Sequence, residues 1–210
     1  MNAPTFHHRK TQGEQTRRAI LQSAMDLASV DGLSGLSIGG LAKDLQMSKS
    51  GLFAHFGSKE ALQLAVIEAA RTLVLREVVR PALRSSQGLP RLWSLCEAWL
   101  HYTERQLFRG GCFFAATSTE FNSRPGLIRD RLAVIMAERQ QTFARLIAKA
   151  QETGEIQMNI DVTQLAYELD TLLFGANWAF QLYEDPQVIV RSRLAMRNRL
   201  QHACVVPDHM

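Results

Sequence analysis

A short polar run in the first third of the chain carries residue types that bind phosphate. Ser48-Lys49-Ser50-Gly51 opens a predicted helix, with Ser48 as its N-cap. The free N–H groups at the start of a helix attract anions, and Lys49 adds a positive charge at the same end. Short side chains at this tip can reach base edges or the DNA backbone. The run therefore indicates a nucleic-acid contact made by a helix N-terminus.

Sequence motifs typical of enzyme active sites are absent. The chain contains no nucleophile elbow, P-loop, GxGxxG turn or HExxH motif. His101, His202 and His209 have no evident acid or thiol partner in the sequence. We therefore expect no catalytic residue and no cofactor, and a small helical enzyme is kept as an alternative class.

Cysteine and histidine usage does not indicate a metal site. Cys96, Cys112 and Cys204 are an odd number without CxxC spacing, which is typical of reduced thiols in a cytosol. His7 and His8 have no third or fourth ligand at a suitable spacing. We expect no metal, and we interpret Cys112 as a buried inert thiol, with an oxidation sensor as the alternative.

Length and composition limit the remaining classes. The chain has 210 residues, of which 46% are hydrophobic and 21% charged, and this excludes a disordered or fibrous protein. The formal net charge of +4 is too small to locate a DNA surface. No apolar run approaches the roughly 18–20 residues of a membrane span, and the first ten residues do not form a signal peptide. We expect a soluble, cytoplasmic protein that does not bind a membrane.

Hydrophobic periodicity predicts helices and no strand. The first helix ends before Gly32, and a long fourth helix begins at Ser58 and is ended or kinked by Pro81. The predicted helices cover residues 14–30, 37–45, 48–56, 58–79, 91–107, 112–122, 123–153, 162–183 and 187–203. For the last of these, Asp185 is the expected N-cap and Pro186 the first helical residue. The expected class is all-α with about nine helices.

The second and third predicted helices form a helix-turn-helix pattern. Only Gln46-Met47 separates them, and a Ser cap followed by Lys opens the second helix of the pair. In DNA-binding proteins of this type, that helix enters the major groove. An ordinary corner between two helices of a bundle is the alternative.

This part of the chain resembles the DNA-binding domain of the tetracycline-repressor (TetR) family. The resemblance is dense over residues 14–62 and rests on Ser37-Ile38, Leu41-Ala42, Ser48–Phe53, His55-Phe56 and Ser58–Leu62. Beyond residue 63 it rests on helix count, chain length and the connector before the last helix pair. The family implies a homodimer with a DNA-binding domain, here residues 1–58, and a ligand-binding and dimerisation domain, here residues 59–210. Most members repress transcription and release DNA when a small molecule binds.

The resemblance also implies roles for single residues. Ser37 and Ser48 match hydroxyls that cap helices and touch phosphate, and His55 and Lys59 match phosphate contacts. Lys49, Ser50 and Gly51 match the start of the recognition helix. The predicted DNA-binding residues are Ser37, Ser48, Lys49, Ser50, Gly51, Phe53, His55 and Lys59.

Three positions depart from the family pattern. Gln46 stands where the family usually has glycine, and a left-handed backbone there costs a non-Gly residue about 1–2 kcal/mol. Phe53 replaces a usual tyrosine and lacks the hydroxyl that would donate to phosphate. Gly39-Gly40 costs about 1 kcal/mol per glycine within a helix, and either permits close approach to DNA or only loosens the helix.

The C-terminal half is rich in aromatic residues. A ligand cavity is mostly apolar with a few polar groups, and inward-facing polar residues are the better indicators, since a buried polar group needs a partner. For any single aromatic residue, ordinary core packing is favoured over ligand binding. The candidate ligand-binding residues are Trp99, Thr103, Thr117, Phe121, Phe174, Asn177 and Trp178.

The last two predicted helices are apolar on more than one face, so they must be buried on more than one side. A two-fold dimer suits the reading of pseudo-palindromic DNA sites. The arginines of the last helix are expected to be solvated or to pair with Glu184 and Asp185. The candidate dimer residues are Leu172, Gly175, Ala176, Ala179 and Leu194.

The sequence as a whole predicts a dimeric transcriptional repressor that binds double-stranded operator DNA. A small, largely apolar effector is expected to release it. A dimeric DNA-binding protein without an effector is the alternative, besides the small enzyme.

Overall fold

The computed structural model describes the backbone of residues 5–205 and the side chains of residues 13–205. The principal helices are α1 Thr5–Asp31, α2 Ile38–Asp44, α3 Lys49–Phe56, α4 Lys59–Val74, α6 Leu89–Glu104, α7 Phe113–Phe121, α8 Leu127–Glu152, α9 Val162–Tyr183 and α10 Gln187–Ala203. Residues 5–205 contain no strand, and the β-type pairing among them is an isolated antiparallel bridge between Ile156 and Cys204. The predicted all-α class is confirmed.

The chain divides into two compact units. Unit 1 comprises residues up to 72 and residues 108–131, and unit 2 comprises residues 73–107 and 132–210. Unit 1 therefore includes α7, which the sequence analysis assigned to the C-terminal domain. Such a placement depends on contacts between distant parts of the chain.

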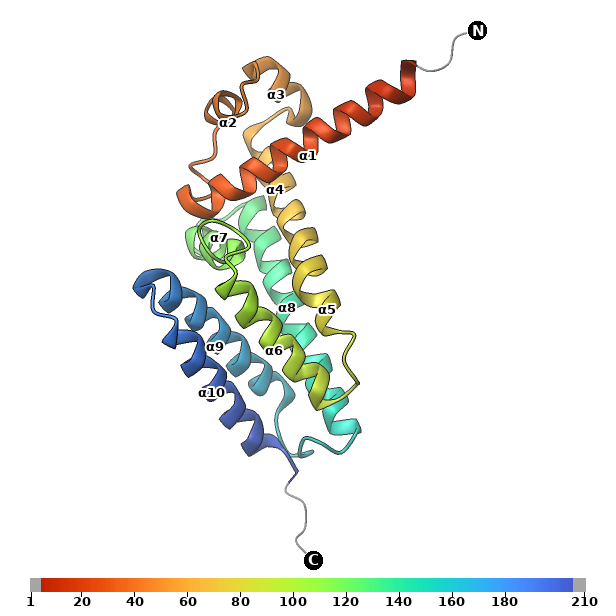
Figure 1. Cartoon of the computed structure of the whole chain (residues 1–210), viewed down its shortest axis with the longest axis vertical. Helices are drawn as coiled ribbons and strands as arrows, with labels where there is room; N and C mark the ends of the chain where they lie inside the picture. Colours follow the sequence, from red (N-terminus) through yellow and green to blue (C-terminus); the bar gives the residue numbers. More distant parts are fainter. Residues whose placement is uncertain (1–4, 206–210) are drawn as a thin grey trace, which may run out of the picture. The chain divides into compact units, whose positions relative to one another are not determined.

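Unit 1 is built on α1, which packs against α2 and α7, while α2 packs against α3 (Figure 1). Helices as short as α2 and α3 are marginal in isolation, so apolar contacts must hold them. Leu41, Ala42 and Leu52 are buried, and Phe56 is half-buried. These residues fix the two short helices to the rest of the unit.

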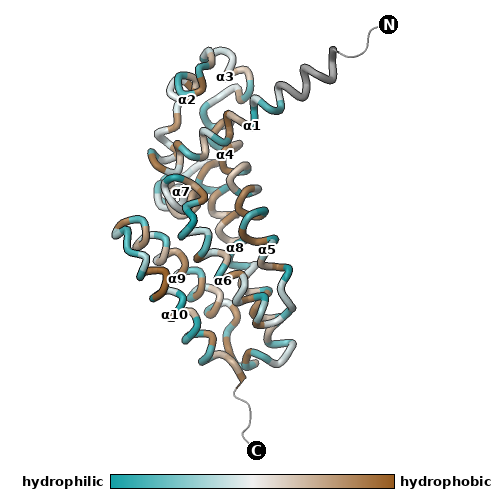
Figure 2. The backbone as a smooth tube through the Cα atoms, in the orientation of Figure 1, coloured by the Kyte–Doolittle hydropathy of each residue, from teal (hydrophilic) through white to brown (hydrophobic). Residues whose placement is uncertain are grey.

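Unit 2 has α6, α9 and α10 lying side by side (Figure 1). Hydrophilic and hydrophobic residues alternate along α10, as expected for a helix buried on one side (Figure 2). On α9, Leu165, Leu169 and Leu173 are buried within the unit. No helix among residues 5–205 is both long enough and apolar enough to cross a bilayer.

The bounds of the last two helices agree with the prediction, with one change in capping. The N-cap of α10 is Pro186, although the side chain of Asp185 accepts a hydrogen bond of 2.9 Å from the Gln187 amide. The prediction for the fourth helix was wrong in its last five residues, where π-helix η1 (Leu75–Val79) replaces regular α-helix, and the three-residue helix α5 (Arg80–Ala82) follows. Pro81 has no amide hydrogen for the usual bond four residues back, which is consistent with this irregular ending.

Candidate nucleic-acid interface

The two predicted serine caps of the helix-turn-helix segment are confirmed. Ser37 Oγ accepts a hydrogen bond of 3.0 Å from the Gly40 amide, and Ser48 Oγ accepts one of 3.0 Å from the Gly51 amide. Lys49 and Ser50 are exposed at the start of α3. The helix N-terminus therefore presents a cation and a hydroxyl to solvent, which favours the binding of a phosphate.

The turn between α2 and α3 has a left-handed residue at the position where the family usually has glycine. Gln46 has φ of 53°, and its amide donates a 3.1 Å hydrogen bond to the Lys43 carbonyl. The Met47 amide bonds to the Ala42 carbonyl at 2.8 Å. The turn is thus closed by backbone hydrogen bonds although a side chain is present at the left-handed position.

Gly39 makes room for the side chain of Lys49. A Cβ atom at position 39 would lie 3.1 Å from Lys49 Cε. The two residues belong to a shallow groove that is also lined by Ile38, Ser50, Phe53 and Ala54. Phe53 is 50% exposed, so it is a surface residue of α3 and not part of the core. The glycine serves close packing of α2 against α3.

Two further candidates, His55 and Lys59, are both engaged within unit 1. Lys59 Nζ donates a 2.6 Å hydrogen bond to the carbonyl oxygen of Ser34, at an exposed site. The His55 carbonyl accepts a 3.3 Å hydrogen bond from Arg17, whose guanidinium lies 4.5 Å from the centroid of the Phe56 ring. Arg17 therefore connects α1 to α3, a role that the sequence analysis missed because nothing local indicates it.

The candidate ligand-binding residues are divided between the two units. Thr117 and Phe121 belong to unit 1, and the other five belong to unit 2. Thr103 and Thr117 are buried, and each hydroxyl donates to the carbonyl four residues earlier in its own helix, at 3.2 and 2.8 Å. Their protons are thereby used within the helix, so a ligand would find these hydroxyls available only as acceptors.

A buried ion pair in unit 2 was not predicted. Arg139 Nε lies 2.5 Å from Asp170 Oδ1, and both side chains are about nine-tenths buried. The Arg139 guanidinium also lies 4.0 Å from the centroid of the Trp99 ring. Trp99, a candidate for ligand binding, is in turn packed edge-on against Tyr102. The positive charge of Arg139 is thus balanced by the negative charge of Asp170.

Trp178 requires a correction. The sequence analysis placed it at an internal ligand cavity, but its side chain is 55% exposed and lies edge-on against Tyr183. Position 178 lies on the face of α9 that carries Tyr167 and Leu182, whereas Asn177 lies on the buried face. Trp178 belongs to the surface of the unit.

The candidate dimer residues on α9 and α10 differ in their exposure to solvent. Gly175 and Leu194 are exposed, and Leu172 and Ala179 are half-buried. Ala176, which the sequence analysis named as a candidate dimer residue, is only 2% exposed and packs inside its own unit instead. Five further large apolar residues, absent from the list of candidate dimer residues, lie on the same two helices. Together with Leu194 they form what we call the apolar stripe, whose members are all more than half exposed: Tyr167, Trp178, Leu182, Tyr183, Val190 and Leu194.

The arginines of α10 form specific pairs. Arg191 lies 3.4 Å from Asp185 as predicted, whereas Arg193 hydrogen-bonds to Glu97 of α6 at 2.9 and 3.0 Å. Arg199 pairs with Glu168 of α9, where a hydrogen bond from Gln164 and the Arg199 pair lower the pKa of the carboxyl. These partners are distant in sequence, which is why they were not predicted.

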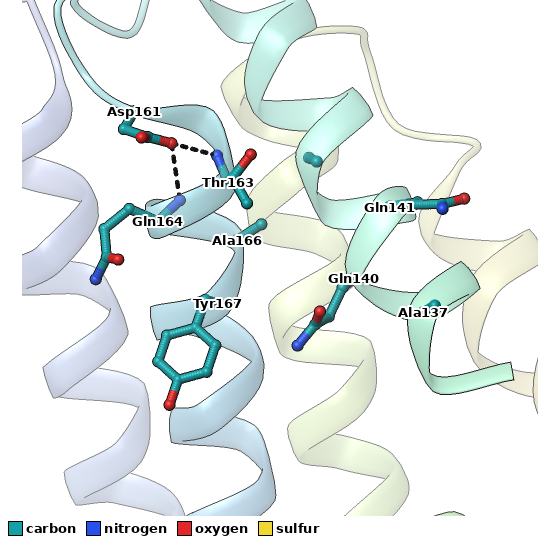
Figure 3. A pocket seen from close by; sticks show the side chains of 9 residues that line it. Ala137, Gln140, Gln141, Asp161, Thr163, Gln164, Ala166 and Tyr167 are labelled. Carbon is teal, nitrogen blue, oxygen red and sulfur yellow. Dashed lines mark hydrogen bonds between the residues drawn. The ribbon is translucent and has the colours of Figure 1, made fainter. Parts of the chain in front are cut away.

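A groove of about 570 Å³ lies between α8 and α9 of unit 2 (Figure 3). Gln140 and Tyr167 face it from the two helices, and Asp161 caps α9 at one end through the Thr163 and Gln164 amides. None of the seven candidate ligand-binding residues lines this groove.

Two of the three cysteine thiols are buried. Burial raises the pKa of Cys96 to about 12, and Cys112 is also buried, which favours the inert-thiol interpretation. Among residues 13–205, no group of three or more His, Cys, Asp or Glu is placed to hold a metal ion. The side chains of His7, His8 and His209 lie outside the described residues.

Sequence comparison assigns both parts of the chain. Residues 20–66 match the family model described as "Bacterial regulatory proteins, tetR family", and residues 88–196 match "Tetracyclin repressor-like, C-terminal domain". The transcriptional regulator AcuR of Cereibacter sphaeroides is 25% identical over 71% of this chain and 68% of its own length. The HTH-type transcriptional regulator UidR of Escherichia coli K12 is 24% identical over 79% of this chain and 82% of its own length.

Solved structures agree with this assignment. A TetR transcriptional regulator from Chloroflexus aurantiacus J-10-fl has a TM-score of 0.86 at 22% identity, covering 92% of this chain and 98% of its own. A transcriptional regulator from Saccharomonospora viridis, solved in complex with choline, has a TM-score of 0.78 at 24% identity, covering 92% and 99%. The solved structures show that the fold is shared, and the two family models show that the sequence pattern is shared as well. The chain is therefore a member of the TetR family of DNA-binding transcriptional regulators.

Proposed function

We propose that this regulator is a homodimeric repressor that leaves its operator when a small, largely apolar molecule binds to its C-terminal part. The observation that carries the proposal is the exposed N-terminus of α3, where Ser48 caps the helix and Lys49 and Ser50 face solvent. Each protomer would insert this end of α3 into the major groove.

The DNA contacts divide into two kinds. Lys49 and Ser50 are placed to reach base edges and neighbouring phosphates, while Lys59 is placed to contact phosphate alone. Among the described side chains, the exposed Lys59 ammonium donates one hydrogen bond, to the Ser34 carbonyl, so it retains donors for a phosphate. Phe53 would add apolar contact with the groove in place of the usual tyrosine.

Dimerisation is supported by the apolar stripe. Six large apolar side chains, each more than half exposed, lie on the two helices α9 and α10. Isolated apolar residues on a surface need no explanation, but a concentration on one helix pair is typical of an interface. A second copy of the chain, related by a two-fold axis, would cover the same stripe on both protomers.

The charge balance of unit 2 supports an apolar effector. Arg139 and Asp170 already neutralise each other beside Trp99, so a charged ligand would have to break this pair to gain a partner. The structure from Saccharomonospora viridis holds choline, which supports small-molecule binding in this fold.

The function can be tested without knowing the operator. Random double-stranded DNA would first be enriched on the full-length protein, and tryptophan emission would then be followed while small hydrophobic compounds are titrated with and without the selected duplex. We expect coupling of about 1–3 kcal/mol, equal in both directions because allosteric coupling is reciprocal. If a compound binds with the same affinity in both titrations, the effector-free alternative is favoured. If no duplex is enriched, the proposed groove contact is wrong.

A further inference from the structure

The loop between α1 and α2 is held by a carboxylate from α7. Glu120 accepts hydrogen bonds from the Leu33 amide at 2.7 Å and the Ser34 amide at 2.9 Å, and a third from the Ser34 hydroxyl. Its side chain is 16% exposed. Gly32 adopts φ of 81°, and a Cβ atom there would lie 3.0 Å from Glu120 Oε2. The loop is thus shaped around this carboxylate, and all these residues belong to unit 1.

The same loop residue is bonded on its other side to a candidate DNA contact. The Ser34 carbonyl accepts the 2.6 Å hydrogen bond from Lys59 Nζ, and the Leu33 carbonyl accepts a buried 2.7 Å hydrogen bond from Gln63. Ser34 therefore stands between the carboxylate of Glu120 and the ammonium of Lys59. Two hydrogen-bonded steps connect α7 to the start of α4.

Two separate family models cover the partners in this chain of bonds. Ser34 and Lys59 fall within the DNA-binding model over residues 20–66, whereas Glu120 falls within the C-terminal model over residues 88–196. Glu120 is also followed on α7 by Phe121, a candidate ligand-binding residue whose ring lies 5.3 Å from the Arg124 guanidinium. Arg124 in turn donates a 3.3 Å hydrogen bond to Ser34 Oγ.

We propose that Glu120 is a positioning residue for operator binding, which acts through Ser34 to place the Lys59 ammonium where it meets a DNA phosphate. Without Glu120, the amides of Leu33 and Ser34 lose their acceptor, and the Ser34 carbonyl is no longer fixed beside Lys59. A displacement of α7 would reach Lys59 by the same route. The inference depends on the proposed DNA contact of Lys59 and adds the residue that aligns it.

The test compares full-length variants on the enriched duplex at several salt concentrations. Lys59→Ala should lower the slope of log affinity against log salt by roughly one unit per protomer. Glu120→Ala should give a similar loss, and the double variant should lose little more than either single variant, because both changes remove the same contact. Glu120→Gln, which keeps an acceptor oxygen of the same size, should recover part of the affinity.

Glu68→Gln is the matched control. Glu68 is another carboxylate of unit 1, hydrogen-bonded to Arg131, and its variant should leave the salt slope unchanged. If Glu120→Ala lowers the melting temperature but keeps the slope and affinity of the control, Glu120 is only structural and the proposal is overturned. If Glu120→Ala does not fold, Glu120→Gln alone must show a reduced slope at wild-type helicity, and an unchanged slope overturns the proposal. An unchanged slope for Lys59→Ala would instead overturn the proposed DNA contact itself.

Discussion

The guanidinium carbon of Arg139 lies 4.0 Å from the centroid of the Trp99 ring, while its Nε lies 2.5 Å from Asp170 Oδ1. One buried cation is thus balanced by an aromatic face and a carboxylate. The arrangement joins α6, α8 and α9 of unit 2, which carry these three residues. Because both charges are buried, each depends on the other for its stability.

We predict that Arg139→Met destabilises the protein by about 3–5 kcal/mol, since Asp170 is left as an unpaired buried charge. The measurement is urea unfolding followed by circular dichroism. Arg139→Lys should cost less, because the charge remains although the planar stacking on Trp99 is lost. The double variant Arg139→Met/Asp170→Leu should recover most of the loss, and a double variant as unstable as the single one would contradict the ion-pair argument.

Gln46→Gly is predicted to stabilise the protein by about 1 kcal/mol, because glycine adopts the left-handed backbone of the turn without steric cost. A gain of this size corresponds to a rise in melting temperature of roughly 2–4 °C. Gln22→Gly is the control, since position 22 is exposed within α1 and should lose about 1 kcal/mol through lower helix propensity. Equal destabilisation by both variants would rule out strain at Gln46.

Gly39→Ala should separate stability from DNA affinity. Alanine is favoured over glycine in a helix by about 1 kcal/mol, but its Cβ would lie 3.1 Å from Lys49 Cε and displace that flexible side chain. We expect a melting temperature no lower than that of the wild type and weaker binding to the enriched duplex. Lys49→Ala should weaken binding too and blur base preference at one position of each half-site. Wild-type affinity in both variants would show that α3 does not enter the groove.

The apolar stripe is predicted to form the dimer interface. Gly175→Leu adds a side chain into open space within the single chain, so it should disturb only a partner packed against α9. We expect the dimer to weaken by about 1–3 kcal/mol, measured by sedimentation, with unchanged helicity. Ala133→Leu adds similar apolar bulk on the exposed face of α8 and should leave the dimer intact. A wild-type protein that sediments as a monomer at micromolar concentration would contradict the prediction.

Local rules were sufficient for the helices and for the tip of α3. The caps at Ser37 and Ser48 and the bounds of α9 follow from residues a few positions apart, and such interactions are encoded by neighbours in the sequence. Periodicity alone also indicated the all-α class. The last five residues of the predicted fourth helix were the exception, where η1 replaced the expected α-helix.

Tertiary structure decided what the distant residues do. It turned Trp178 to the surface and Ala176 to the interior, although both lie on one helix with a similar apolar neighbourhood in the sequence. It also paired Glu120 with the Ser34 backbone, 86 positions away. A carboxylate at position 120 carries no local signal of its partner, because the acceptor is satisfied by amides that only folding brings within hydrogen-bond distance.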